Sequence, residues 1–86
     1  MTMYMKKTIR KYILEHLLFT EDESTLQDDE SFLNNGIVDS TGVMEIILFI
    51  EENFGFRVND DEIMPANLDS VNNLTDFIQR KQVIAA

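Results

Sequence analysis

The chain has 86 residues, a length that suits a single domain spanning residues 1–86, with no second core. It carries 16 acidic and 7 basic residues, and the resulting net charge of −9 argues against nucleic acid and anionic membrane surfaces as partners. The sequence has no cysteine, which excludes disulfides, thiolate metal sites and a cysteine nucleophile.

The first predicted element is an amphipathic helix from Tyr4 to Leu18. Charged residues interrupt its apolar positions, so we expect neither a signal peptide nor a membrane span, and cytoplasmic residence follows as the default. We also expect a monomer. His16, the only histidine, receives no role because a lone histidine is more often a packing or surface residue. The apolar residues that recur at helical spacing are Met5, Ile9, Tyr12, Ile13, Leu14, Leu17 and Leu18.

A long acidic loop is expected from Thr20 to Asp39. Loops of this length are uncommon in compact domains and are often functional, which draws attention to the segment that follows. The loop has only scattered apolar residues, which we expect to anchor it to the core: Leu26, Phe32, Leu33, Ile37 and Val38.

The strongest helical pattern runs from Ser40 to Phe54. Asp39 and Ser40 are both suitable caps for its first turn, and Gly55 is placed to end it in a left-handed turn. One face is expected to be buried and carries Val43, Ile46, Ile47, Ile50 and Phe54, while Glu45, Glu51 and Glu52 are expected to be more exposed.

Two further helices are expected in the last third of the chain. The segment from Asn59 to Glu62, which holds three acids, marks the start of a short third helix that Pro65 prevents from continuing far. Ser70 introduces a fourth helix with one apolar stripe, and no strand with a partner is visible. The predicted fold is all-α, a small four-helix bundle of three longer helices and one short helix, with a long loop between the first two.

The segment Gly36-Ile37-Val38-Asp39-Ser40 places a serine hydroxyl after an acid at the start of a helix. Asp-Ser in this position is usually a simple cap. A helix N-terminus also favours a bound anion, so a phosphodiester on Ser40 would lie in a favourable field. The residues alone leave both interpretations open, with the cap favoured.

This segment, with Glu45-Ile46 after it, resembles the attachment motif of acyl and peptidyl carrier proteins. The resemblance covers most of the chain, including the long loop, the Asp-Ser start of the second helix, the short third helix and the closing fourth helix. It implies that Ser40 bears 4'-phosphopantetheine, transferred from coenzyme A by a magnesium-dependent phosphopantetheinyl transferase that recognises Asp39. The thiol of this arm would carry the cargo as a thioester, which makes the protein a carrier and a substrate of enzymes.

The subtype implied by the resemblance is a stand-alone carrier similar to the D-alanyl and aminoacyl types. Fatty-acid carriers commonly have leucine and a further acid after Asp-Ser, whereas this chain has Thr41 and Gly42. An adenylating acyl- or aminoacyl-ligase and a downstream acyltransferase or synthase are the implied partners. Basic surfaces of these enzymes are expected to contact the second helix, at Thr41, Met44, Glu45, Glu51 and Glu52.

Other functions fit the sequence less well. A helical adaptor without a prosthetic group would bind partners through the same helix, and intact mass distinguishes the two. A serine hydrolase is a poor interpretation, because the sequence shows neither a base paired with the serine nor an oxyanion-hole motif. The acidic clusters do not follow the EF-hand order, so they are expected to be solvated faces with no dedicated metal site, and weak binding of divalent ions stays open. Met44 and Met64 are expected to fill the core, with groove lining as the alternative.

Overall fold

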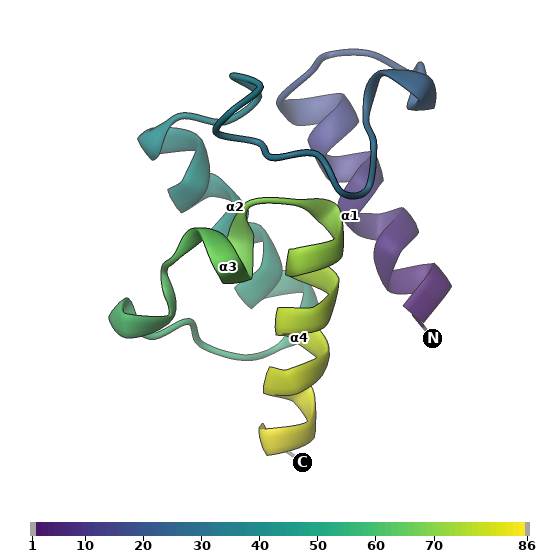
Figure 1. Cartoon of the computed structure of the whole chain (residues 1–86). Coiled ribbons are helices and arrows are strands. Elements are labelled where there is room, and N and C mark those ends of the chain that lie inside the picture. The colour runs from purple at the N-terminus through teal and green to yellow at the C-terminus, as the bar shows by residue number, and fades with distance from the viewer. Residues whose placement is uncertain (1, 86) are drawn as a thin grey trace.

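The computed structural model describes residues 2–85, with side chains described for residues 4–39 and 41–82. Its elements in chain order are α1 (Thr2–His16), η1 (Glu23–Thr25), α2 (Ser40–Phe54), η2 (Asp60–Glu62), α3 (Pro65–Leu68) and α4 (Val71–Ala85). Helix α4 packs against α1, α2 and α3, and the long connection from α1 to α2 crosses one end of the bundle (Figure 1). The described residues contain no strand, and the all-α prediction is confirmed.

A hydrophobic core joins the three long helices and the loop. Helix α4 contributes the predicted stripe, since Val71 and Ile78 are fully buried and Leu74 and Phe77 nearly so. The other buried apolar residues come from α1, the loop, α2 and α3: Met5, Ile9, Ile13, Leu14, Leu26, Phe32, Val38, Ile46, Ile47, Ile50 and Leu68. Within the described residues, no helix is both long enough and apolar enough to cross a membrane.

Helix α2 has the predicted bounds, Ser40–Phe54. The carboxylate Oδ1 of Asp39 accepts a hydrogen bond of 2.8 Å from the backbone N–H of Gly42, so Asp39 is the cap and Ser40 is the first helical residue. Gly55 ends the helix with φ 74°, a left-handed conformation that a residue without a β-carbon adopts at little cost.

The predicted inner face of α2 is only partly correct. Ile46, Ile47 and Ile50 are buried, but Val43 and Phe54 are half-buried against the edge of the core. The expected burial of Met44 and Met64 is wrong, because 52% and 44% of these residues remain exposed. Periodicity identified the face, whereas the extent of burial depends on which neighbours cover it.

The third helix begins at Pro65, the residue that the sequence predicted would limit it. Asp60–Glu62 form only the single turn η2, and α3 starts at Pro65 instead of stopping there. Proline suits the first helical position, since its missing N–H would have no partner within the helix and its φ is already helical. The separate turn η2 is tied to α4 by an ion pair of 2.8 Å between Lys81 Nζ and Glu62 Oε1.

The long loop is anchored to the core much as predicted. Leu26, Phe32 and Val38 are buried, Ile37 is half-buried, and Leu33 is the exception, with 46% of the residue exposed. Polar contacts add to this anchoring: Arg10 of α1 donates to the carbonyl of Leu26 at 2.9 Å and to Asp28 at 2.7 Å. These contacts hold the loop across the end of the bundle where α2 begins.

Candidate functional site

The N-terminus of α2 is the centre of the candidate site. Its preceding residues are held by the loop, because the backbone N–H groups of Ile37 and Val38 both donate to the carbonyl of Phe32, at 2.9 and 3.4 Å. Gly36, with φ 69°, makes the turn that leads into them. Asp39 is exposed and caps the helix, as described above, whereas the side chain of Ser40 lies outside the described part of the structure.

A second tether fixes this loop from the side of α3. Asp69, which follows α3, accepts hydrogen bonds from the Ser31 hydroxyl and, at 2.9 Å, from the backbone N–H of Leu33. The carbonyl of Asp69 accepts a further bond of 2.8 Å from the N–H of Phe32. Asp69 therefore sets the position of Phe32 and Leu33 beside the start of α2.

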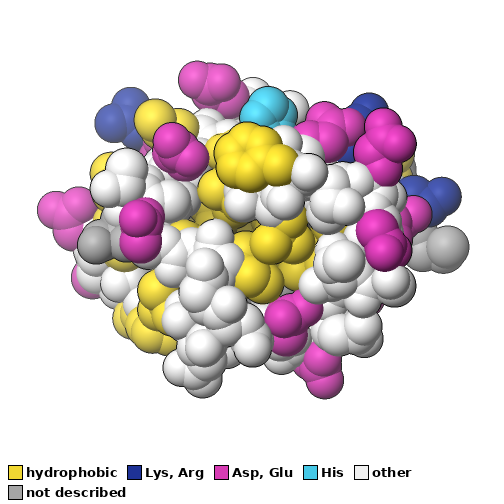
Figure 2. Space-filling view, turned by 90° about the horizontal axis from the view of Figure 1, so that it is seen from above, with side chains coloured by type: hydrophobic (Ala, Val, Ile, Leu, Met, Phe, Trp, Pro, Cys, Tyr) yellow, Lys and Arg dark blue, Asp and Glu magenta, His cyan; other side chains and the backbone are white. Residues whose placement is uncertain are grey.

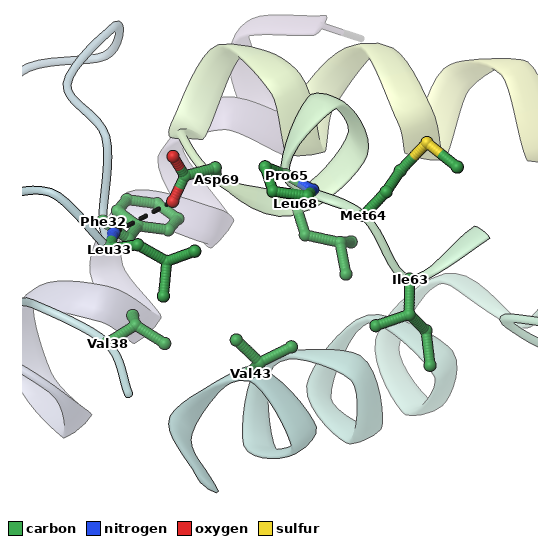
Figure 3. Close-up of a pocket in the computed structure, with 9 residues that line it drawn as sticks. All are labelled: Phe32, Leu33, Val38, Val43, Ile63, Met64, Pro65, Leu68 and Asp69. Atoms are coloured by element: carbon green, nitrogen blue, oxygen red, sulfur yellow. Dashed lines mark hydrogen bonds between the residues drawn. The ribbon is translucent and has the colours of Figure 1, made fainter. Parts of the chain in front are cut away.

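An apolar pocket lies between this loop, α2 and α3 (Figure 3). Val43 of α2 and Leu68 of α3 face each other across it, and the Leu33–Asp69 hydrogen bond closes one side. The pocket has a volume of about 160 Å³. Its lining residues are Phe32, Leu33, Val38, Val43, Ile63, Met64, Pro65, Leu68 and Asp69.

A wider and more polar hollow lies beside the α2 N-terminus. It has a volume of about 430 Å³ and combines residues from the end of α1, the loop and the first turns of α2. Asp39 and Thr41, the two neighbours of Ser40 in the chain, both contribute to it. The other lining residues are His16, Leu17, Phe19, Gly36, Ile37, Val38, Gly42 and Glu45.

Sequence reasoning missed the contribution of α1 to this hollow. His16 and Phe19 carry no motif that links them to Asp39, which lies about twenty residues later in the chain. The ring of His16 stacks on Tyr12 with centroids 4.9 Å apart, and Tyr12 stacks on Phe49 of α2 at 4.1 Å. Burial, together with the nearby Glu45 carboxylate, raises the pKa of the Tyr12 hydroxyl above its ordinary value.

The surface around the start of α2 is acidic. Figure 2 shows the end of the bundle crossed by the loop, where acidic side chains surround a central area of exposed apolar atoms. Of the residues expected to contact partners, Thr41, Met44, Glu45 and Glu52 are exposed. Glu51 differs from these four, because it is half-buried and its Oε2 accepts a hydrogen bond of 2.8 Å from the N–H of Val58.

The site is open enough for a large attachment. Exposed Asp39 and Thr41 flank Ser40, and both line the polar hollow. Among residues with described side chains, no group of three or more histidine or acidic residues is arranged to hold a metal ion. The exposed neighbours Asp39 and Thr41 leave room for a long covalent arm such as phosphopantetheine.

An all-helical bundle with an exposed, capped helix N-terminus at an acidic face has the features expected of a small carrier protein. The chain belongs to the phosphopantetheine attachment site family, which matches residues 7–78. It is a phosphopantetheine-carrying acyl carrier, on which partner enzymes act and which is not itself a catalyst.

Individual relatives agree with this assignment. The acyl carrier protein of Acidothermus cellulolyticus is 37% identical over 62 residues, which are 72% of this chain and 71% of that protein. The acyl carrier protein of Buchnera aphidicola subsp. Acyrthosiphon pisum is 30% identical over 79 residues, or 92% and 94% of the two chains. The solution NMR structure of a holo acyl carrier protein from Nitrosomonas europaea matches with a TM-score of 0.74 and 29% identity, covering 91% of this chain and 95% of that one.

Proposed function

We propose that Ser40 is the residue to which phosphopantetheine is attached. The observation that carries this proposal is the placement of Ser40 as the first residue of α2, directly after the exposed cap Asp39 and before Thr41, which lines the same hollow as Asp39. The N-terminus of a helix favours an anion, so a phosphodiester at this position is stabilised despite the acidic surroundings.

The attachment reaction is a phosphoryl transfer from coenzyme A. The Ser40 oxygen forms a bond to the β-phosphorus, the pyrophosphate P–O bond breaks, and adenosine 3',5'-bisphosphate leaves while the serine proton passes to a base of the transferase. Asp39 has two roles in this proposal. It caps α2 through the N–H of Gly42, and its exposed carboxylate helps the transferase recognise the serine.

Intact-mass measurement tests the attachment site. Apo protein incubated with coenzyme A, magnesium and a phosphopantetheinyl transferase should gain the mass of one phosphopantetheine, and Ser40→Ala should gain nothing. Ser31→Ala and Ser70→Ala are matched controls and should be modified normally. Ser31 is engaged by Asp69, and Ser70 is buried and accepts a 3.0 Å bond from the N–H of Asn73, so neither is presented as an attachment point. Modification of Ser40→Ala would place the arm elsewhere.

The cargo in this proposal is an amino acid or a small acyl group, delivered by an adenylating ligase and passed to an acyltransferase or synthase. The size of the apolar pocket supports a small cargo: it measures about 160 Å³, and a protein cavity of about 150 Å³ binds benzene. Thr41 and Gly42 support the same conclusion, since they stand where fatty-acid carriers commonly have leucine and an acid. A monomer that works in the cytoplasm completes the proposal.

A further inference from the structure

Phe19 has a backbone conformation that its side chain does not favour. Its φ is 54°, and it is the only non-glycine residue with a positive φ in the described part of the chain. The conformation closes the end of α1, where the N–H of Leu18 reaches the carbonyl of Ile13 at 3.0 Å and the N–H of Thr20 reaches that of Leu14 at 2.9 Å. Glycine or asparagine usually takes such a position, because a β-carbon crowds the backbone there.

The Phe19 side chain does not offset this strain by packing. It is 81% exposed, more than any other large hydrophobic residue with a described side chain. Apolar groups stabilise a fold in proportion to the surface they remove from water, so Phe19 contributes little to folding. Phenylalanine at this position therefore neither suits the backbone conformation nor stabilises the core. A strained and exposed residue of this kind indicates a functional role.

Phe19 lies close to the proposed attachment point. It lines the same hollow as Asp39 and Thr41, the residues on either side of Ser40. A typical protein–protein interface covers about 800 Å² on each partner. We therefore expect an enzyme that brings its reacting atoms to Ser40 to cover Phe19 as well.

The charge around Phe19 indicates what kind of surface would bind it. Glu21 is exposed two residues after Phe19 in the chain, and Asp39 and Glu45 are exposed residues of the hollow that Phe19 lines. A complementary surface has lysine and arginine side chains around an apolar recess. Exposed aromatic residues are frequent anchors in such interfaces.

We propose that Phe19 is a docking anchor, which inserts into an apolar recess bordered by basic side chains on the transferase that modifies Ser40. This inference rests on the proposed function, because it assumes that the transferase approaches the N-terminus of α2. It adds a contact from the end of α1 to those expected from α2.

The test compares the transfer of phosphopantetheine from coenzyme A to the wild-type apo chain and to Phe19→Gly. Loss of a buried aromatic anchor should lower kcat/KM by about 10- to 30-fold, mostly through a higher KM. The melting temperature should rise or stay unchanged, because glycine adopts a positive φ without strain. Weaker docking in a variant that is no less stable distinguishes an anchor from a structural residue.

Two matched variants complete the test. Tyr4→Ala removes an exposed aromatic residue near the start of α1, about 18 Å from His16 along the helix axis at about 1.5 Å per residue. This variant should be modified at the wild-type rate. Phe19→Leu keeps an apolar side chain and should retain more of the rate than Phe19→Gly.

Wild-type kcat/KM for Phe19→Gly would overturn the proposal. The proposal would also be overturned if transfer is unchanged and Phe19→Gly alters the spectrum of the holo protein but not of the apo protein. That result would mean that Phe19 contacts the phosphopantetheine arm and not the transferase. Neither result bears on Ser40, whose role is tested separately by the mass of Ser40→Ala.

Discussion

Val38 lies so close to Gly42 that a β-carbon added to the glycine would be 2.9 Å from Val38 Cγ1. From sequence, Gly42 is only a residue with weak helix propensity, at a position where fatty-acid carriers commonly have an acid. The structure shows that it has a packing role, because Val38 is buried and leaves no space for a side chain in the first turn of α2. This contact joins the loop to the helix beside the proposed attachment point.

The first prediction is that Gly42→Ala destabilises the fold. Overpacking typically costs about 1–3 kcal/mol, and alanine recovers about 1 kcal/mol of helix propensity. We expect a net loss of about 1 kcal/mol in the free energy of unfolding, measured in urea. The double variant with Val38→Ala should be less destabilised than the sum of the single changes. A stabilised Gly42→Ala chain would show that Val38 moves aside at no cost.

The second prediction ranks two residues of α2. Ile50 is fully buried, so Ile50→Ala should cost about 2–5 kcal/mol. Phe54 is half-buried and packs edge-on against Phe49 with centroids 6.3 Å apart, so Phe54→Ala should cost about 1–2 kcal/mol despite removing more atoms. Urea unfolding of both variants checks the order, and a larger loss for Phe54→Ala would contradict it.

The sequence predicts a helix boundary well where the residues that determine it are neighbours in the chain. Helix α2 has the predicted bounds because Asp39, the apolar spacing and Gly55 are neighbours in the chain and agree. The prediction that Pro65 limits the third helix was wrong, because proline can either stop a helix or start one. Which of the two occurs depends on the contacts of the residues around it. The left-handed turn at Phe19 has no sequence signal, since that turn normally requires glycine or asparagine.

The third prediction concerns acid stability. The hydrogen bond from Lys81 and that from the N–H of Asn59 lower the pKa of Glu62 below its ordinary value. The Glu62 carboxyl therefore binds a proton less tightly in the folded state than in the unfolded state. Its contribution to stability is fully present above the pKa of the unfolded state and is lost as the pH falls through the pKa of the folded state.

The matched variants for this prediction are Glu62→Gln and Lys81→Gln. Each should lower stability at pH 7 by about 0.5 kcal/mol, typical of a partly exposed pair. Each should also reduce the loss of stability as the pH falls below the ordinary pKa of a glutamate. Urea midpoints at several pH values measure this. A variant with unchanged acid sensitivity would show that the pair contributes nothing to it.

The fourth prediction is that salt stabilises the fold. Most of the 16 acidic residues lie between Phe19 and Asp69, so their mutual repulsion opposes the compact state. Sodium chloride and millimolar divalent cations should therefore raise the melting temperature by screening this repulsion. The ion pairs of Asp28 with Lys6 and Arg10 are screened as well, but they are few beside the excess of negative charge. A melting temperature that is independent of ionic strength would contradict this prediction.

The last prediction addresses the partner face of α2 and the proposed specialised pathway. Glu45→Lys and Glu52→Lys reverse exposed charges, so they should leave the fold intact while slowing loading of the holo protein by its adenylating ligase. The effect should weaken at high salt, because exposed charges act mainly on the rate of encounter.

Glu51 requires a different substitution, because its carboxylate accepts the hydrogen bond from Val58. Glu51→Lys would leave that backbone N–H without its acceptor and lower stability by about 1–3 kcal/mol, which would confuse folding with docking. Glu51→Gln keeps an acceptor oxygen while removing the charge, so any change in its loading rate reports on docking alone. The measurement is the loading rate of each variant at low and high salt, with circular dichroism to confirm the fold. If the lysine variants load normally and fatty-acid synthase enzymes elongate the holo protein efficiently, both the partner face and the specialised pathway are wrong.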